Sequence, residues 1–341
     1  MIQEHVDLQS LNTFGLKASA RYFCHADSEP VLNEALRFAQ TRDLPLLVIG
    51  GGSNLLLRED FSGVVIRMAL SGIAHEVRDD DSVCVDAASG ENWHDFVAHC
   101  LAQGWYGLEN LALIPGSVGA APIQNIGAYG VEAGDFIESV RVLDIATGQQ
   151  QTLSREACDF GYRDSVFKRS LRGNTLILGV RFRLWRQPQP NIRYAALAES
   201  LRGKQPGPQE IFDAVCAIRR SKLPDPAELG NAGSFFKNPV ISAAHYARLQ
   251  QVAHDIPGFV SGDGHSVKVP AAWLIERAGW KGRSVGGAAV YERQALVIVN
   301  RDHASAQDVV TLATEIMASV RQQFGVALEP EVQWVPPFSA T

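Results

Sequence analysis

The chain has no long hydrophobic run and no sign of a secretion signal. Its longest apolar stretches, such as residues 44–49, are far shorter than the roughly 20 residues that a membrane-spanning helix needs. Glu4, His5 and Asp7 stand at the N-terminus, where a signal peptide would carry basic residues followed by an apolar stretch. These absences predict a cytoplasmic protein without a membrane partner.

Paired cysteines and clustered histidines are also missing. The five cysteines are widely separated and none forms a C-x-x-C pair, which argues against a disulfide framework or a structural zinc site. The nine histidines show no H-E-x-x-H spacing, so no bound metal is expected. We expect each cysteine to be a small buried apolar residue; they are Cys24, Cys84, Cys100, Cys158 and Cys216.

The charge balance lacks an excess of basic residues. Lys and Arg number 31 against 37 Asp and Glu, giving a net charge of -6, whereas a nucleic-acid partner requires a positive surface. With 46% hydrophobic and 20% charged residues over 341 positions, the chain is a globular protein of two or three domains. We expect no nucleic-acid partner and a monomer.

Apolar periodicity predicts both helices and strands. Helices are expected at 28–41, with Ser28 as N-cap, and at 92–103, 208–220, 270–278 and 304–324; strands are expected at 44–49, 63–68, 82–86, 138–145, 174–185 and 295–300. Residues 187–191, with two prolines among polar residues, are the best candidate for a linker. The mixture predicts an α+β fold.

A first glycine segment follows the aliphatic strand at 44–49. It reads Gly50-Gly51-Gly52-Ser53-Asn54, and its bare backbone amides could approach a diphosphate. Neither a P-loop nor a dinucleotide fingerprint fits, because no Gly-Lys-Ser/Thr ends the segment and Leu55 stands where a third glycine is needed. A structural tight turn is an equally good interpretation of these glycines alone.

A second glycine-rich segment spans residues 114–130. Small residues dominate it, nothing in it is charged, and Gln124 and Asn125 are its directional polar groups. Such a stretch allows a flat ligand to lie against backbone, and irregular segments of this length are usually functional. The alternative is a buried Gly/Ala-rich crossover.

Two further segments carry candidate catalytic groups. Arg163 lies between Tyr162 and Asp164 and is suited to a carboxylate or phosphate, although an Arg163–Asp164 surface pair is the commoner fate of such neighbours. Ser234 stands between a glycine and two phenylalanines, with Lys222 and Lys237 nearby in sequence. Its hydroxyl could transfer a proton or bind an anion, and its default interpretation is a turn or cap.

A G-x-S-x-G pattern at 282–286 matches the hydrolase nucleophile elbow only superficially. The elbow leaves a strand and enters a helix, whereas here a predicted helix precedes the pattern. A serine hydrolase is therefore not expected.

Taken together, the motifs resemble the UDP-N-acetylenolpyruvoylglucosamine reductase (MurB) family. The matching segments cover nearly the whole chain in the family's order: Leu11-Asn12-Thr13-Phe14, 50–56, 114–130, Gly161-Tyr162-Arg163-Asp164-Ser165, Lys222-Leu223-Pro224-Asp225-Pro226, 233–239 and Glu329-Pro330-Glu331-Val332. A tyrosine-bearing insert at 191–201 resembles the longer of the family's two types, although Ala195 follows Tyr194 where that type usually has glycine.

The resemblance implies an FAD enzyme with the vanillyl-alcohol-oxidase-like (PCMH-type) flavoprotein fold and a C-terminal α+β substrate domain. It implies an FAD-binding subdomain at 1–67 completed by the tail 332–341, a second at 68–220 that includes the insert, and a substrate-binding domain at 221–331. The implied reaction uses NADPH to reduce UDP-N-acetylglucosamine enolpyruvate to UDP-N-acetylmuramate in peptidoglycan precursor synthesis.

The resemblance also implies roles for individual residues. Arg163 and Glu331 would polarise the enolpyruvyl carboxylate, and Ser234 would donate the proton. Residues matching the cofactor site are Ile49, Gly50, Gly51, Gly52, Ser53, Asn54, Leu55, Ile114, Pro115, Gly116, Ser117, Gly119, Ala120, Gln124, Asn125, Gly127 and Tyr129. Residues matching the nucleotide-sugar site are Tyr162, Tyr194, Lys222, Asn238 and Gln294.

The chemistry of the residues agrees with these roles. A hydride can attack an electron-rich enol ether only if the conjugated carboxylate takes up the developing charge, for which Arg163 is the natural cation. The neighbouring carbon then becomes basic enough to accept a proton even from a serine. Two alternatives stay open: a flavin oxidase of the same fold, and a nucleotide-sugar binding protein that has lost catalysis.

Overall fold

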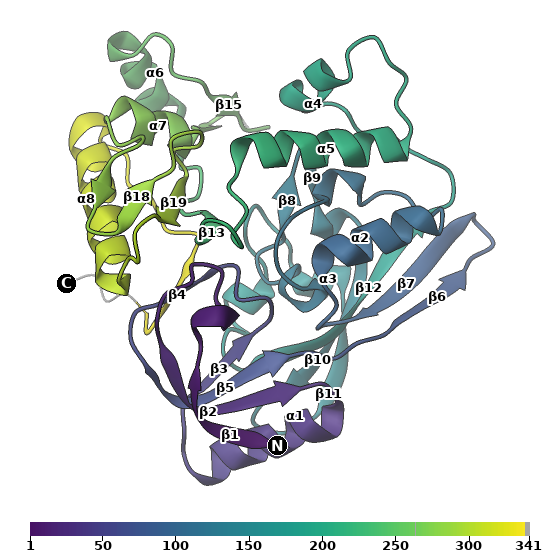
Figure 1. Cartoon of the computed structure of the whole chain (residues 1–341). Helices are drawn as coiled ribbons and strands as arrows, with labels where there is room; N and C mark the ends of the chain where they lie inside the picture. Colours follow the sequence, from purple (N-terminus) through teal and green to yellow (C-terminus); the bar gives the residue numbers. More distant parts are fainter. Residues whose placement is uncertain (263, 338–341) are drawn as a thin grey trace. The chain divides into compact units, whose positions relative to one another are not determined.

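The chain forms two compact units, each made of several segments. The computed structural model describes residues 1–262 and 264–337 (Figure 1). The first unit consists of residues 1–6, 20–51 and 61–221, and the second of 7–19, 52–60 and 222–341. The three-domain division at 67, 220 and 331 stays a prediction, and residues 338–341 of its tail lie outside the described residues.

One sheet of the first unit has the order β1-β2-β5-β3 and packs against helix α1. Its elements are β1 (Ile2–Asp7), β2 (Ser19–Ala26), β5 (Phe61–Met68), β3 (Leu46–Ile49) and α1 (Glu29–Thr41). Strands β2 and β3 both run parallel to β5. Helix α1 buries Leu32 and Leu36 on the face that the periodicity predicted. Ser28 occupies the N-cap position as predicted, although its hydroxyl donates to Asp27 and makes no capping hydrogen bond to the helix.

The other sheet of the first unit is antiparallel, with the order β11-β10-β12-β7-β6. Its strands are β11 (Gln150–Ser154), β10 (Ile137–Asp144), β12 (Thr175–Trp185), β7 (Ser82–Ala88) and β6 (Ile73–Val77). Between these strands along the chain lie α2 (Trp93–Ala102), α3 (Arg155–Cys158) and the small pair β8 (Gly127–Ala128) and β9 (Val131–Glu132), and after β12 follow α4 (Ala195–Ser200) and α5 (Pro208–Lys222). Trp93 and Phe96 of α2 pack against Phe182 of β12. This core fixes the start of α2, where the Asn92 side chain accepts from the Asp95 amide.

The second unit contains an antiparallel sheet of order β13-β19-β18-β17. Its elements are β13 (Asn231–Ser234), β19 (Val297–Asn300), β18 (Ala288–Val290), β17 (Ser284–Val285), α7 (Ala271–Arg277) and α8 (Ala306–Phe324). A smaller sheet contains β14 (Val240–Ser242), β16 (Ser266–Lys268) and β15 (Phe259–Val260), and α6 (Ala243–Val252) lies between β14 and β15 along the chain. Strand β4 (Leu55–Leu57) pairs in parallel with β20 (Gln333–Val335).

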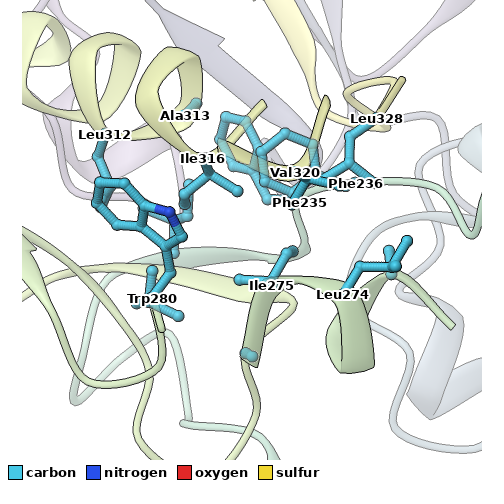
Figure 2. Close-up of a cluster of buried hydrophobic side chains, with 14 of the residues drawn as sticks. Phe235, Phe236, Leu274, Ile275, Trp280, Leu312, Ala313, Ile316, Val320 and Leu328 are labelled. Atoms are coloured by element: carbon cyan, nitrogen blue, oxygen red, sulfur yellow. The ribbon is translucent and has the colours of Figure 1, made fainter. Parts of the chain in front are cut away.

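A large apolar cluster supports the second unit. Figure 2 shows Phe235 and Phe236 near Ile316 and Val320 of α8, all of them buried. Helix α8 begins with a capping box between Ser305 and Asp308 and ends at Gly325 in the left-handed conformation. The residues directly after Ser234 are therefore anchored in the core.

The helices and strands expected from periodicity are all present, with bounds shifted by a few residues. The five cysteines are free and buried, as predicted. Within the described residues, no helix combines the length and the apolar character that crossing a membrane would require. Ser284 of the G-x-S-x-G pattern lies in β17, which pairs directly with β18, so the strand-to-helix elbow of a hydrolase is not formed there.

Candidate functional site

The structure brings the two glycine segments together in the first unit. A β-carbon on Gly51 would lie 3.1 Å from the Cα of Gly116, and one on Gly50 would collide with the Ser117 side chain. Side chains are therefore excluded where the two backbones meet. The first segment therefore packs directly against the second, and the binding of a cofactor by the two stays a prediction.

The second segment is tied to the start of α2. The Trp93 amide donates to the Gly116 carbonyl over 3.1 Å, and the Gly119 amide donates to the Ser89 carbonyl over 2.9 Å. Gly119 packs so closely that an added β-carbon would lie 2.5 Å from the Ser89 Cβ. The buried Ser89 hydroxyl has no hydrogen-bond partner among the described residues.

Asn125 holds this loop in shape. Its side-chain amide donates to the Gly161 carbonyl and to Glu132, and its oxygen accepts from the Gly134 amide over 2.7 Å. The residue is buried and has a positive φ of 45°, which asparagine tolerates better than most residues. The sequence singled out Asn125 as a cofactor ligand; the structure adds this internal role.

Arg163 lies against the same loop. Its Nη2 donates to the Gly127 carbonyl over 2.7 Å, and its guanidinium carbon is 5.4 Å from the centre of the Tyr162 ring. Asp164 forms an ion pair with Arg169. The hydrogen bond to Gly127 shows that the loop positions the arginine.

Tyr129 and Tyr194 are neighbours in the first unit. Their ring centres are 5.2 Å apart with an edge-to-face angle of 81°. Asn110 donates to the carbonyls of Tyr129 and Asn191, linking the end of the glycine loop to the segment before Tyr194. Burial raises the pKa of the Tyr129 hydroxyl, which therefore stays protonated at neutral pH.

In the second unit, Ser234 and Glu331 come from adjacent stretches of backbone. The Glu331 amide donates to the Phe235 carbonyl over 2.8 Å, and Asn54 donates from its side chain to the Glu331 carbonyl over 3.3 Å. The Ser234 hydroxyl makes no hydrogen bond to any residue that the structure describes. These three predicted site residues, remote in sequence, thus share one region.

The residues of the second unit that are predicted to bind the nucleotide-sugar differ in their hydrogen bonds and exposure. Gln294 lies in the turn before β19, where its side chain accepts from the Leu296 amide, and the Leu296 carbonyl accepts from the Phe235 amide next to Ser234. Asn238 accepts from the Ala271 amide at the start of α7. Lys222 is exposed at the end of α5.

The residues present fit a flavin nucleotide. Gly50, Gly51 and Gly116 leave backbone without side chains, as a diphosphate requires, and the uncharged small residues of 114–130 suit a flat ring. The buried Ser89 hydroxyl beside Gly119 supplies a further polar group.

Comparison with known proteins agrees with this assignment. Residues 20–154 match the model of an FAD binding domain, and residues 225–335 match that of the UDP-N-acetylenolpyruvoylglucosamine reductase C-terminal domain. A reductase of this name from Paraburkholderia xenovorans is 52% identical, with 95% of each chain covered. The chain belongs to the UDP-N-acetylenolpyruvoylglucosamine reductase family. Another relative of that name, from Azoarcus sp., is 50% identical over 98% of each chain.

A solved structure extends the agreement to the fold. The crystal structure of UDP-N-acetylenolpyruvylglucosamine reductase (MurB) from Thermus caldophilus superposes with a TM-score of 0.68 at 24% identity, covering 98% of this chain and 99% of that one. The predicted α+β FAD-binding fold is confirmed, and FAD is the cofactor of this reductase family member.

Sequence reasoning missed two polar residues at this site. His94 on α2 and Arg219 on α5 both bind Leu113, the residue directly before the second glycine segment. Each lies in a regular helical pattern, so neither its spacing nor its neighbours distinguished it from an ordinary surface residue.

Proposed function

We propose that this chain uses NADPH to reduce UDP-N-acetylglucosamine enolpyruvate to UDP-N-acetylmuramate, the reaction of its family, in the cytoplasm and as a monomer. The observation that carries the proposal is the hydrogen bond from the Glu331 amide to the Phe235 carbonyl, which brings the backbone of Glu331 beside the residue that follows Ser234. When bound, FAD would supply the hydride in this reaction.

Arg163 and Glu331 bind and polarise the substrate carboxylate in this proposal. Negative charge develops on the carboxylate side of the double bond when a hydride reaches the terminal carbon, and a guanidinium stabilises that charge. The hydrogen bond from Arg163 to Gly127 supports the role, because it orients the guanidinium before substrate arrives.

Ser234 donates the proton to the neighbouring carbon. Its hydroxyl forms no hydrogen bond with the described residues, so no such bond has to break before the hydroxyl donates its proton to the substrate. A serine hydroxyl is a weak acid, but the carbon that receives the proton is strongly basic once the hydride has arrived.

The remaining assignments follow the same reasoning. Ile49 to Leu55 and the predicted ligands within 114–129 bind FAD through backbone amides and short side chains. Tyr162, Tyr194, Lys222, Asn238 and Gln294 bind the nucleotide-sugar. The packing of Tyr194 on Tyr129 supports a tyrosine-bearing insert that covers this part of the site.

The test measures absorbance and cofactor consumption on purified protein. Flavin absorption in the blue is expected, together with NADPH oxidation that depends on the enolpyruvyl sugar. A colourless protein, or oxygen consumption without NADPH, would overturn the proposal. An equal rate with NADH would overturn only the choice of nicotinamide cofactor.

A further inference from the structure

The imidazole of His94 is used as a hydrogen-bond acceptor inside the first unit. Its Nδ1 accepts from the Leu113 amide over 3.0 Å, and its ring stacks on Phe212 of α5 with centres 5.4 Å apart and planes 13° from parallel. Because an N–H group points at Nδ1, that nitrogen carries no proton. The ring is therefore neutral, with its proton on Nε2.

Leu113 is bound at both of its backbone polar groups. Besides the amide bond to His94, its carbonyl accepts from Arg219 Nε over 3.1 Å. Its φ is +58°, a left-handed conformation that costs a leucine about 1–2 kcal/mol relative to the right-handed one. Side chains from two different helices thus hold a residue in a conformation that it would not adopt alone.

This turn sets where the cofactor loop begins. Leu113 directly precedes Ile114-Pro115-Gly116, and Gly116 is the residue whose backbone contacts Gly51. A change of φ at Leu113 would swing the following peptide groups away from that contact, because one backbone torsion redirects the whole chain after it.

We propose that His94 is a positioning residue for FAD binding: together with Arg219 it holds Leu113 in the left-handed turn that presents the 114–120 loop to the cofactor. The inference rests on the proposed assignment of this loop to FAD. His94 itself need not contact the cofactor, because it acts through the Leu113 backbone.

Protonation of His94 would undo the arrangement. A proton on Nδ1 would place N–H against the Leu113 N–H, and the hydrogen bond would be lost. Burial lowers the pKa of His94; among the charged groups that act on it, Asp95 on its own helix raises the pKa, and Arg220 and Arg219 on α5 lower it. These influences together keep the ring neutral at neutral pH.

The experiment measures the affinity of FAD for the apoprotein, by calorimetric titration at pH 7.5. His94→Leu removes the acceptor and leaves the Leu113 amide without a partner, so we expect a dissociation constant on the order of tenfold higher. His94→Asn keeps an acceptor oxygen at the position of Nδ1 and should bind FAD more like the wild type. Phe212→Leu, which removes the stacked ring and keeps the acceptor, is the matched control.

Equal losses in His94→Asn and His94→Leu would overturn the inference, as would wild-type affinity in His94→Leu. If His94→Leu fails to fold by circular dichroism, the pH profiles decide. The wild type should lose FAD affinity between pH 7.5 and 5.5 more steeply than His94→Asn, and superimposable profiles would overturn the inference. A wild-type apoprotein that binds no FAD would instead overturn the proposed function.

Discussion

The site residues of the two units are held in place by different means. In the first unit, the proposed site contains bare backbone at Gly51 and Gly116 and left-handed residues such as Leu113 and Arg163. In the second unit, Ser234 and Glu331 lie on paired extended segments directly before a buried core. The first arrangement requires conformations that cost energy, and side chains must maintain them; the second inherits its geometry from the sheet.

This difference predicts which properties a substitution in each unit will change. Substitutions in the first unit should weaken cofactor binding and stability together, because backbone shape is the binding feature. Substitutions of the side chains in the second unit should reduce turnover while leaving the fold and the flavin intact.

The largest effect is expected for Ser234→Ala. Losing a general acid typically costs about 10²- to 10⁴-fold in rate, so product formation should fall by that range. Reduction of the flavin by NADPH, flavin content and melting temperature should stay at wild-type values. Stopped-flow and steady-state kinetics on one preparation measure both steps, and equal product formation in the mutant would remove Ser234 from the mechanism.

The next largest effect is expected for Arg163→Gln, which tests whether a substitution in the first unit can reduce turnover as well as cofactor binding. The side chain binds the loop at Gly127 and is proposed to bind the substrate, so turnover should fall by about 10²- to 10³-fold and FAD affinity should also decline. Arg169→Gln is the control, because Arg169 forms exposed ion pairs with Asp159 and Asp164. If the control loses as much turnover as Arg163→Gln, the effect is structural.

Gly119→Ala should lower stability and FAD affinity without altering any group that is proposed to react with the substrate. The added methyl group would lie 2.5 Å from the Ser89 Cβ, and such overpacking costs about 1–3 kcal/mol of unfolding free energy. Thermal unfolding of the apoprotein and FAD titration measure the two losses. Gly262→Ala, where a methyl group meets nothing within 4 Å, should be nearly neutral. Wild-type stability in Gly119→Ala would contradict the tight packing.

The smallest effect concerns pH. The folded-state pKa of His94 is lowered, so the unfolded chain takes up this proton first as the pH falls. The stabilisation from the neutral ring is complete above about pH 6.5, the unfolded value, and is lost as the pH falls through the folded pKa. The melting temperature of the apoprotein should therefore decline more in the wild type than in His94→Asn between pH 7.5 and 5.5. Parallel declines would remove His94 as the titrating group.

Much of the fold followed from periodicity. The stripe on α8 and the aliphatic run of β3 predicted their elements because burial demands apolar residues at regular spacing. Short strands such as β13 and β17 have no such pattern, since an element of a few residues is defined by its partners rather than by its own sequence. Ser28 illustrates the same limit at a helix end, where an adjacent Asp27 competes for the hydroxyl.

The sequence also predicted part of the candidate site. Unusual composition exposed the glycine segments and the Gly-Ser-Phe-Phe motif around Ser234, because bare backbone and a hydroxyl before two core aromatics are rare patterns. The sequence did not indicate His94 or Arg219, since their proposed role depends on the hydrogen bonds that their side chains make to Leu113.

Sequence by itself therefore determined the class of fold and the main helices and strands, and it predicted which segments carry the chemistry, because residue type and spacing are local properties. Tertiary structure alone decided that Gly51 meets Gly116, that Glu331 pairs beside Ser234, and that a neutral histidine secures the turn at Leu113. Such contacts join residues far apart along the chain, and only the packed backbone sets the distances between them.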